Sequence, residues 1–175
     1  MAAAISDHAE VWKIRAQELN SCKREEQFDV VTCLWNVLGH IRTKADRERA
    51  LSGIADCMSP HGTCFLDVNH RYNARAYGVV PTLARFLKDR IFLSETAGDV
   101  SPKWQCDEMT ISTHGHFFTQ GEVRELAARA GLQIEDRIVV DYETGAVRRF
   151  GYEGNLLYIL RRTSRIESSN ALQTS

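Results

Sequence analysis

The sequence lacks a long hydrophobic run and an excess of charge of either sign. No apolar stretch approaches the roughly 20 residues that a membrane-spanning helix needs, and the N-terminus MAAAISDHAE has no basic segment followed by an apolar one. The formal net charge is -1, and acidic and basic residues are mixed along the chain, so no cationic stripe indicates binding to a phosphate backbone. We therefore expect a cytoplasmic protein that binds neither a membrane nor a nucleic acid.

Paired cysteines and several common catalytic motifs are also missing. The five cysteines are odd in number and never form CxxC, which favours reduced thiols over disulfides or a zinc site. The sequence contains neither a GxSxG nucleophile turn nor a P-loop. His114 and His116 would share one face of a strand, but no third ligand accompanies them, so we expect packing histidines and no metal.

The residues that are present indicate one globular domain in which strands alternate with helices. Of the 175 residues, 43% are hydrophobic and 26% are charged, a profile typical of a domain with a full-sized core. Apolar runs and alternation predict strands, and helical spacing with capping signals predicts helices. The predicted strands are residues 11–15, 28–34, 63–68, 103–106, 109–118, 132–142 and 156–160, and the predicted helices are residues 44–58, 81–93 and 121–130. A turn is expected at residues 59–62.

Polar side chains follow two of the predicted core strands. Trp35, Asn36 and His40 come after the strand 28–34, and Asn69, His70, Arg71 and Tyr72 come after the strand 63–68. In an open, mostly parallel sheet, ligands bind outside the carboxyl ends of the strands, so these groups would meet at one edge. They could bind a small zwitterion, because a guanidinium pairs with a carboxylate and an amide can orient an amine.

Each of these residues also has a structural interpretation. Asn36 could cap the short helix VLGHI, a role that Asn often fills. His40 could be a hydrogen-bonded structural histidine, since nothing in the sequence fixes its partner. Arg71 needs an anionic partner, and an internal Glu or Asp would serve as well as a ligand.

Three stretches resemble the middle of class I S-adenosylmethionine-dependent methyltransferases, and most closely the glycine and sarcosine N-methyltransferase group. They are FDVVTCLWNVLGHI, ALSGIADCMSPHG and TCFLDVNHRYN. That group has a strand ending in Cys-Leu, then a small residue, Asn and, four positions on, His, and a later strand ending in Asp-His-Arg. The matching positions are Cys33, Leu34, Asn36, His40, His70 and Arg71, whereas Trp35 replaces the small residue and Asn69 replaces the Asp.

The resemblance implies a fold, a cofactor and roles for particular residues. The fold would be an α/β, open, mostly parallel Rossmann-like methyltransferase sheet with an antiparallel last strand, and the cofactor would be S-adenosylmethionine. Gln17 and Glu18 would lie near its adenine, and Leu34 and Trp35 against its methionine portion. Asn36 and His40 would be the catalytic residues that orient a small-molecule acceptor, and Arg71 and Tyr72 would bind it. An amine that bears a carboxylate is one candidate acceptor.

The resemblance also predicts a missing part. Family members begin with a strand and a Gly-x-Gly-x-Gly turn, and this turn does not occur in the sequence. We expect residues 1–162 to form a partial methyltransferase-like domain without its first two strands, with 81–107 as a lid insertion and 163–175 as a disordered tail. The alternative is a truncated, non-catalytic module that binds no cofactor and acts, if at all, by interaction.

The missing strands would leave one edge of the strand 28–34 without its neighbour. The strand 11–15 would then either pair with this edge or be displaced from it. An unpaired hydrophobic edge is an aggregation hazard, so we also expect self-association through it.

Overall fold

The structure is a computed structural model that describes residues 9, 11–21, 27–92, 94, 96–106 and 109–163. The helical elements are η1 (Ala16–Ser21), η2 (Val37–His40), α1 (Lys44–Cys57), α2 (Ala74–Tyr77), α3 (Val79–Ile91), α4 (Gln120–Arg129) and η3 (Gly151–Glu153). The strands are β1 (Phe28–Cys33), β2 (Met58–Val68), β3 (Asp99–Val100), β4 (Lys103–Cys106), β5 (Met109–Ser112), β6 (Gly115–His116), β7 (Leu132–Val140), β8 (Val147–Arg148) and β9 (Asn155–Arg162).

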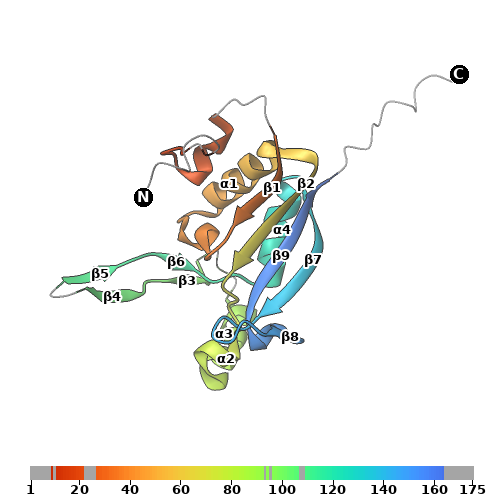
Figure 1. The fold of residues 1–175 in the computed structure, drawn as a ribbon. Helices are drawn as coiled ribbons and strands as arrows, with labels where there is room; N and C mark the ends of the chain where they lie inside the picture. The colour runs from red at the N-terminus through yellow and green to blue at the C-terminus, as the bar shows by residue number, and fades with distance from the viewer. Residues whose placement is uncertain are drawn as a thin grey trace, which may run out of the picture.

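The main sheet has five strands in the order β1-β2-β9-β7-β8, and Figure 1 shows it as the centre of the molecule. β1 and β2 are parallel, whereas β9 is antiparallel to both of its neighbours, β2 and β7. Helices α1 and α4 lie side by side behind the sheet in this view (Figure 1). The partial Rossmann-like sheet with an antiparallel last strand is confirmed, with one parallel pair among the strands that the structure describes.

The hydrophobic core lies between the sheet and this pair of helices. Leu51 and Ile54 of α1 and Leu126 of α4 pack towards alternate residues of the central strands, and all are at most 5% exposed. The strand residues in this core include Cys64, Leu66, Val68, Leu156, Tyr158 and Leu160. Both helices begin as the sequence predicts, since the hydroxyl of Thr43 accepts from the backbone N of Asp46 and Thr119 forms a capping box with Glu122.

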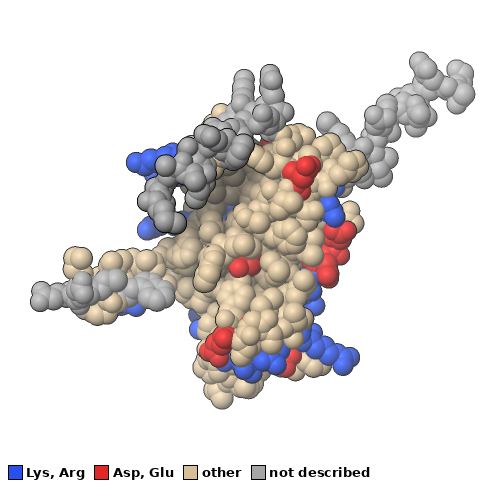
Figure 2. All heavy atoms as spheres, viewed as in Figure 1, with Lys and Arg blue, Asp and Glu red and all other residues tan. Residues whose placement is uncertain are grey.

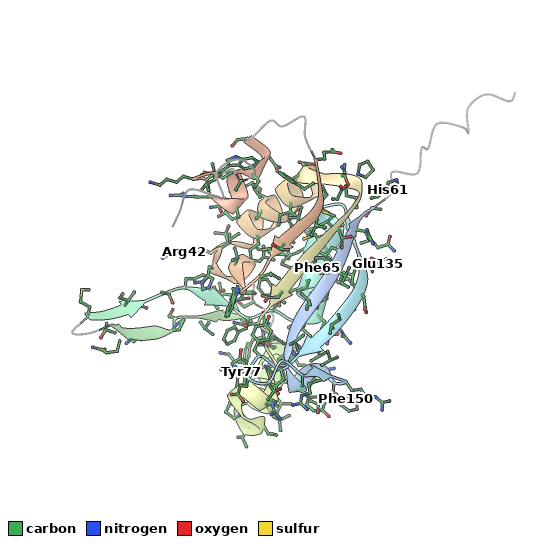
Figure 3. The ribbon with its side chains drawn as sticks, in the orientation of Figure 1. Arg42, His61, Phe65, Tyr77, Glu135 and Phe150 are labelled. Carbon is green, nitrogen blue, oxygen red and sulfur yellow. The ribbon has the colours of Figure 1, made fainter. Side chains whose placement is uncertain are left out.

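The opposite face of the sheet has no helix over it among the described residues (Figure 1). The register places Thr32, Phe65 and Ile159 in one row across this face. Phe65 carries a label on it in Figure 3, and Figure 2 shows the same face dominated by uncharged side chains. Val30, also on this side of β1, is 60% exposed, although its strand has the composition of a fully buried one.

The strand predicted for residues 11–15 is wrong. These residues form no strand, Val11 is 92% exposed, and the η1 turn that follows packs against α1. The segment is therefore displaced from the edge of β1, which was one of the two expected outcomes. β1 pairs with β2 alone among the strands in the described ranges.

Other differences concern turns and short elements. The turn expected at residues 59–62 is absent, because β2 begins at Met58 directly after α1 and accommodates these residues through a shift in its register with β1. The strand predicted at 109–118 divides into β5, which forms the expected hairpin with β4, and β6, which pairs with β3. The hairpin turn at 107–108 and the tail from 164 lie outside the described residues.

The structure also describes three of the five cysteines and the length of the helices. Cys33, Cys57 and Cys64 are free thiols, and burial raises the pKa of Cys33 to about 11 and that of Cys64 to about 12. Cys22 and the side chain of Cys106 lie outside the described part. Within that part of the chain, no helix combines the length and apolar character needed to cross a membrane.

Candidate functional site at the carboxyl ends of β1 and β2

The chain leaves β1 through two consecutive residues in the left-handed region. Trp35 has φ 63° and Asn36 has φ 53°. A non-glycine residue seldom adopts this conformation, and two in succession persist only where surrounding contacts hold them. Trp35 is 82% exposed, while Asn36 is 5% exposed. The turn therefore presents an indole to the outside and holds an amide inside.

Asn36 ties the end of β1 to the end of β2. Its backbone N donates to Asp67 Oδ1 at 2.7 Å, and its Oδ1 accepts from the backbone N of Asn69 at 3.0 Å. Its Nδ2 donates to the carbonyl of His116 at 3.4 Å. Asn36 occupies the N-cap position of η2, but its side chain makes no capping hydrogen bond, so the capping interpretation is wrong in that respect. Its side-chain amide is bonded to two segments of the protein, the end of β2 and β6, and its catalytic role stays a prediction.

Gly39 makes room for this amide. A Cβ added at Gly39 would lie 2.3 Å from Asn36 Nδ2 and 2.7 Å from Oδ1, and the backbone N of Gly39 donates to the carbonyl of Asn36. A side chain at position 39 would therefore displace Asn36. The glycine in the predicted motif LWNVLGH is explained by this contact.

Arg71 is buried and surrounded by protein acceptors. Its Nη2 lies 2.7 and 2.8 Å from the two carboxylate oxygens of Glu122, and its Nη1 lies 3.2 Å from Asp89 Oδ2. Its Nε donates to the carbonyl of Phe117. The geometry favours the internal-carboxylate interpretation of Arg71. Binding of an acceptor carboxylate stays a prediction.

Tyr72 shares one of these carboxylates. Its hydroxyl donates to Asp89 Oδ2 at 2.8 Å. Burial raises the pKa of Tyr72 to about 12, and the hydrogen bond and charge of Asp89 add to this effect. Asp89 on α3 therefore fixes both residues that were predicted to bind the acceptor.

Three further residues complete the network, and sequence reasoning assigned none of them to the site. The Nδ1 of His116 donates to Asp99 Oδ1 at 2.6 Å, and its Nε2 lies 3.6 Å from Glu122 Oε1. Burial raises the pKa of Glu122, but hydrogen bonds from His116 and Thr119 and the charge of Arg71 outweigh it and lower the pKa to about 2. The capping box marked Glu122 in the sequence, whereas no local pattern marks Asp99.

His116 joins the two halves of the site. Its carbonyl accepts from Asn36, and its ring contacts the carboxylate that holds Arg71. His114 lies nearby, with Nε2 3.9 Å from Asp99 Oδ1, and desolvation lowers its pKa. In the described part of the chain, no group of three or more His, Cys, Asp or Glu side chains could hold a metal ion.

The other predicted residues lie apart from this network. His40 is exposed, and its Nδ1 donates to the carbonyl of His114 at 2.9 Å, which leaves it at the rim of the site. Gln17 and Glu18 belong to η1, which packs on α1 away from the end at which β1 and β2 finish (Figure 1). The structure thus brings Leu34, Trp35, Asn36, Arg71 and Tyr72 to one end of the sheet and leaves η1 elsewhere.

One cavity lies beside the network of Arg71, Glu122 and His116, and a larger one lies away from it. One of about 240 Å³ is lined by Arg47, His116, Phe118 and Glu122, beside the buried charges. Another of about 800 Å³ lies over α4 and β7 and includes none of the predicted site residues. The strand ends are therefore the place where the sequence signals and the geometry coincide.

The comparison with known families identifies the class of protein. A family described as a methyltransferase domain matches residues 4–136, which is more than half of the chain. The protein therefore belongs to this methyltransferase domain family. No curated protein matches the sequence.

Solved structures share the fold at low sequence identity. A S-adenosylmethionine-dependent methyltransferase from Clostridium acetobutylicum is 12% identical with a TM-score of 0.52, over 82% of this chain and 62% of that one. The CcbJ methyltransferase from Streptomyces caelestis is 12% identical with a TM-score of 0.54, over 80% and 59%. A SAM-dependent methyltransferase from Methanosarcina mazei is 15% identical with a TM-score of 0.54, over 85% and 65%. The chain thus spans about three fifths of the length of each structure.

Proposed function

We propose that this protein takes part in S-adenosylmethionine-dependent methyl transfer to a small-molecule acceptor at the carboxyl ends of β1 and β2. Family membership supports the reaction class, and two of the similar structures carry the cofactor in their descriptions. The observation that supports a site at the ends of β1 and β2 is the left-handed turn at Trp35 and Asn36, which hydrogen bonds hold to the end of β2. Family membership also favours an enzyme over the non-catalytic module.

The described residues fit one part of the cofactor. Leu34 and Trp35 are 38% and 82% exposed and give an apolar surface at the end of β1, which suits the methionine portion. An indole face also attracts a cation such as a sulfonium. The predicted contacts of Gln17 and Glu18 with adenine stay predictions, since η1 packs on α1 instead of at this end of the sheet.

The reaction needs positioning more than covalent participation by the protein. S-adenosylmethionine, when bound, supplies an electrophilic methyl group that passes in line to a nitrogen or oxygen, while the electron pair of the broken carbon–sulfur bond stays on sulfur. The chain's own contribution would be to orient the acceptor and to exclude water, which can lower a barrier by several kcal/mol. His40 donates through Nδ1 to a carbonyl, so its Nε2 can accept a proton from the acceptor.

Whether the acceptor bears a carboxylate depends on whether Arg71 can bind one. If the acceptor is an amine that bears a carboxylate, that carboxylate must compete with Glu122 and Asp89 for the guanidinium. Glycine and glycinamide differ only in this group, so a methylation assay with both tests the assignment. A clear preference for glycine supports the carboxylate role, and equal rates contradict it.

A calorimetric titration of the protein with S-adenosylhomocysteine tests the reaction class. We expect saturable binding, and a weaker affinity for the variant Trp35→Ala than for the control Trp12→Ala, because Trp12 lies before η1. No heat of binding, or an equal affinity of the two variants, would contradict the proposed location.

We also propose that the open edge of β1 pairs with the same edge of a second copy. β1 has a strand neighbour on one side among the described residues, and Phe28 and Val30 are 39% and 60% exposed. A charge on an edge strand prevents such pairing. Light scattering should show a dimer for the native chain and a monomer for Val30→Lys. A native monomer at all concentrations would contradict the pairing.

A further inference from the structure

A further cavity lies beside α3 and the segment that follows β2. Its volume is about 710 Å³, within the range of small-molecule sites. Residues from the segment after β2, from α3, from the start of α4 and from η3 line it. None of residues 34–40 lines the cavity, whereas Tyr72, one of the residues predicted to bind the acceptor, does.

The walls of this cavity are apolar and aromatic. Tyr72 packs edge-on against Phe86 with ring centroids 5.5 Å apart, and Leu83 and Tyr152 add further apolar surface. Leu83 is 55% exposed although it belongs to the apolar side of α3. The lining residues include no Lys, Arg, Asp or Glu. A neutral ligand with a ring or an aliphatic body suits these walls better than an ion.

His70 supplies a polar group with a defined role. It is 4% exposed, and its Nδ1 lies 2.7 Å from the carbonyl oxygen of Gly151. Because a carbonyl can only accept, the proton is on Nδ1 and Nε2 carries a lone pair. No described residue makes a hydrogen bond to Nε2. Burial lowers the pKa of His70, which keeps the ring neutral at physiological pH.

Thr82 is a second polar group in the lining. It is 7% exposed, and its hydroxyl oxygen has no hydrogen-bond partner among the described residues. An unpaired buried hydroxyl costs about 1–3 kcal/mol, and such groups in native structures often mark a ligand or water position. A ring nitrogen of His70 and the hydroxyl of Thr82, neither with a hydrogen-bond partner among the described residues, thus line a mostly apolar cavity.

We propose that this cavity binds a neutral aromatic alcohol or amine, with the ring against Tyr72, Leu83 and Phe86 and its O–H or N–H donated to His70 Nε2. The cavity shares Tyr72 with the predicted acceptor site, but neither the turn at Trp35 nor S-adenosylmethionine takes part in it, so ligand binding here can be tested without the cofactor. The chemistry that defines the ligand is one hydrogen-bond donor on an apolar ring.

Titrations with phenol and anisole, followed by amide chemical shifts, test the proposal. The two probes share a ring, and only phenol has a donor. We expect phenol to bind about 3- to 10-fold more tightly, the advantage expected of one hydrogen bond. The largest shifts should fall on residues 70–72, 82–86 and 151–152. Equal affinities, shifts that cluster elsewhere, or no saturation by either probe would overturn the proposal.

The variant His70→Asn separates the ligand contact from the fold. An Asn amide can still donate to the Gly151 carbonyl, but it has no group in the place of Nε2. We expect phenol to fall to the affinity of anisole and anisole to change less than 2-fold. An undiminished preference for phenol would contradict the role of Nε2.

A pair of variants on α3 tests the wall. Leu83 lines the cavity and Leu87 does not, and they are 55% and 53% exposed. Leu83→Gln should weaken both probes several-fold, whereas Leu87→Gln should leave both affinities unchanged. The same effect of both variants would overturn the assignment of the cavity.

Discussion

The two faces of the sheet differ in what covers them. On the face toward α1 and α4, Leu66 of β2 and Leu160 of β9 are fully buried. On the opposite face, Val30 of β1 is 60% exposed, and Phe65 and Ile159 are half-buried. Both faces nevertheless have apolar residues of similar kind. The apolar composition of the central strands is typical of a sheet that is covered on both faces. Among the described residues, helices cover one of these faces.

The same contrast holds at the ends and along the edge of the strands. At the carboxyl ends, Asn36, Arg71 and His116 are buried and bonded to neighbouring segments. Along the open edge of β1, Phe28 and Val30 are exposed. Order at the strand ends thus comes from polar contacts within the chain and does not depend on the uncovered face.

The largest effect is expected for Arg71. Arg71→Ala removes a buried cation, leaves the half-buried carboxylates of Glu122 and Asp89 without it, and should lower the free energy of unfolding by about 3–5 kcal/mol. Arg129→Ala is the matched control, since the side chains of Arg129 and Glu125 are 53% and 43% exposed, and it should cost less than about 1 kcal/mol. Urea denaturation measures both. Similar losses for the two variants would show that the buried network contributes no more than a surface pair.

One substitution in the core and one on the open face measure how much each face of the sheet contributes to stability. Leu66→Ala should lower the free energy of unfolding by about 2–5 kcal/mol, because Leu66 is fully buried and its loss leaves a cavity. Val30→Ala should cost less than about 1 kcal/mol at a side chain that is 60% exposed. A loss at Val30 as large as the loss at Leu66 would mean that the open face is covered in solution.

The stability of the protein at acidic pH tests the charge on Glu122. The pKa of Glu122 is lowered from 4.5 to about 2, so the unfolded chain binds a proton at this group more readily than the folded protein does. The resulting stability is complete above pH 4.5 and is lost as the pH falls toward 2, a change of roughly 2–3 kcal/mol. Glu122→Gln should flatten this part of the stability curve, measured by urea denaturation at several pH values. An unchanged slope would contradict the assignment.

A smaller effect is expected at Gly39. Gly39→Ala should lower the free energy of unfolding by about 1–3 kcal/mol, because the new Cβ overlaps the amide of Asn36. Gly121→Ala in α4 has open space, with its nearest contact at 3.8 Å, and should stabilise by about 0.5–1 kcal/mol. Thermal melts compare the two. A stabilised Gly39→Ala would show that Asn36 has an alternative position.

The sequence predicted the regular elements of the fold well and the buried network poorly. Apolar patterning and capping signals located α1, α4 and the central strands, because each depends on neighbours within a few residues. The strand predicted at 11–15 failed because these residues do not pair with the edge of β1, and the η1 turn that follows packs on α1. Asp89 and Asp99 were missed because their bonds to Arg71 and His116 join residues that are far apart in the sequence, through contacts that only the folded chain creates.

The candidate site was predicted in position more than in role. The polar residues after two strands do converge, as the rule for parallel sheets requires. The sequence could not show that Arg71 would be held by Glu122, which lies 51 positions away. Likewise, no sequence pattern near Asn36 predicts its hydrogen bonds to Asn69 and His116. From the sequence, its side chain could equally cap a helix or bind a ligand.

The most direct test of the proposed cofactor site uses the fluorescence of Trp35. The chain has three tryptophans, so the double variant Trp12→Phe with Trp104→Phe leaves Trp35 as the only one. Trp35 is 82% exposed, and addition of S-adenosylhomocysteine should change its emission in a saturable way, with the same affinity as calorimetry gives. Calorimetric binding without any change in the emission of Trp35 would contradict a cofactor site at the end of β1.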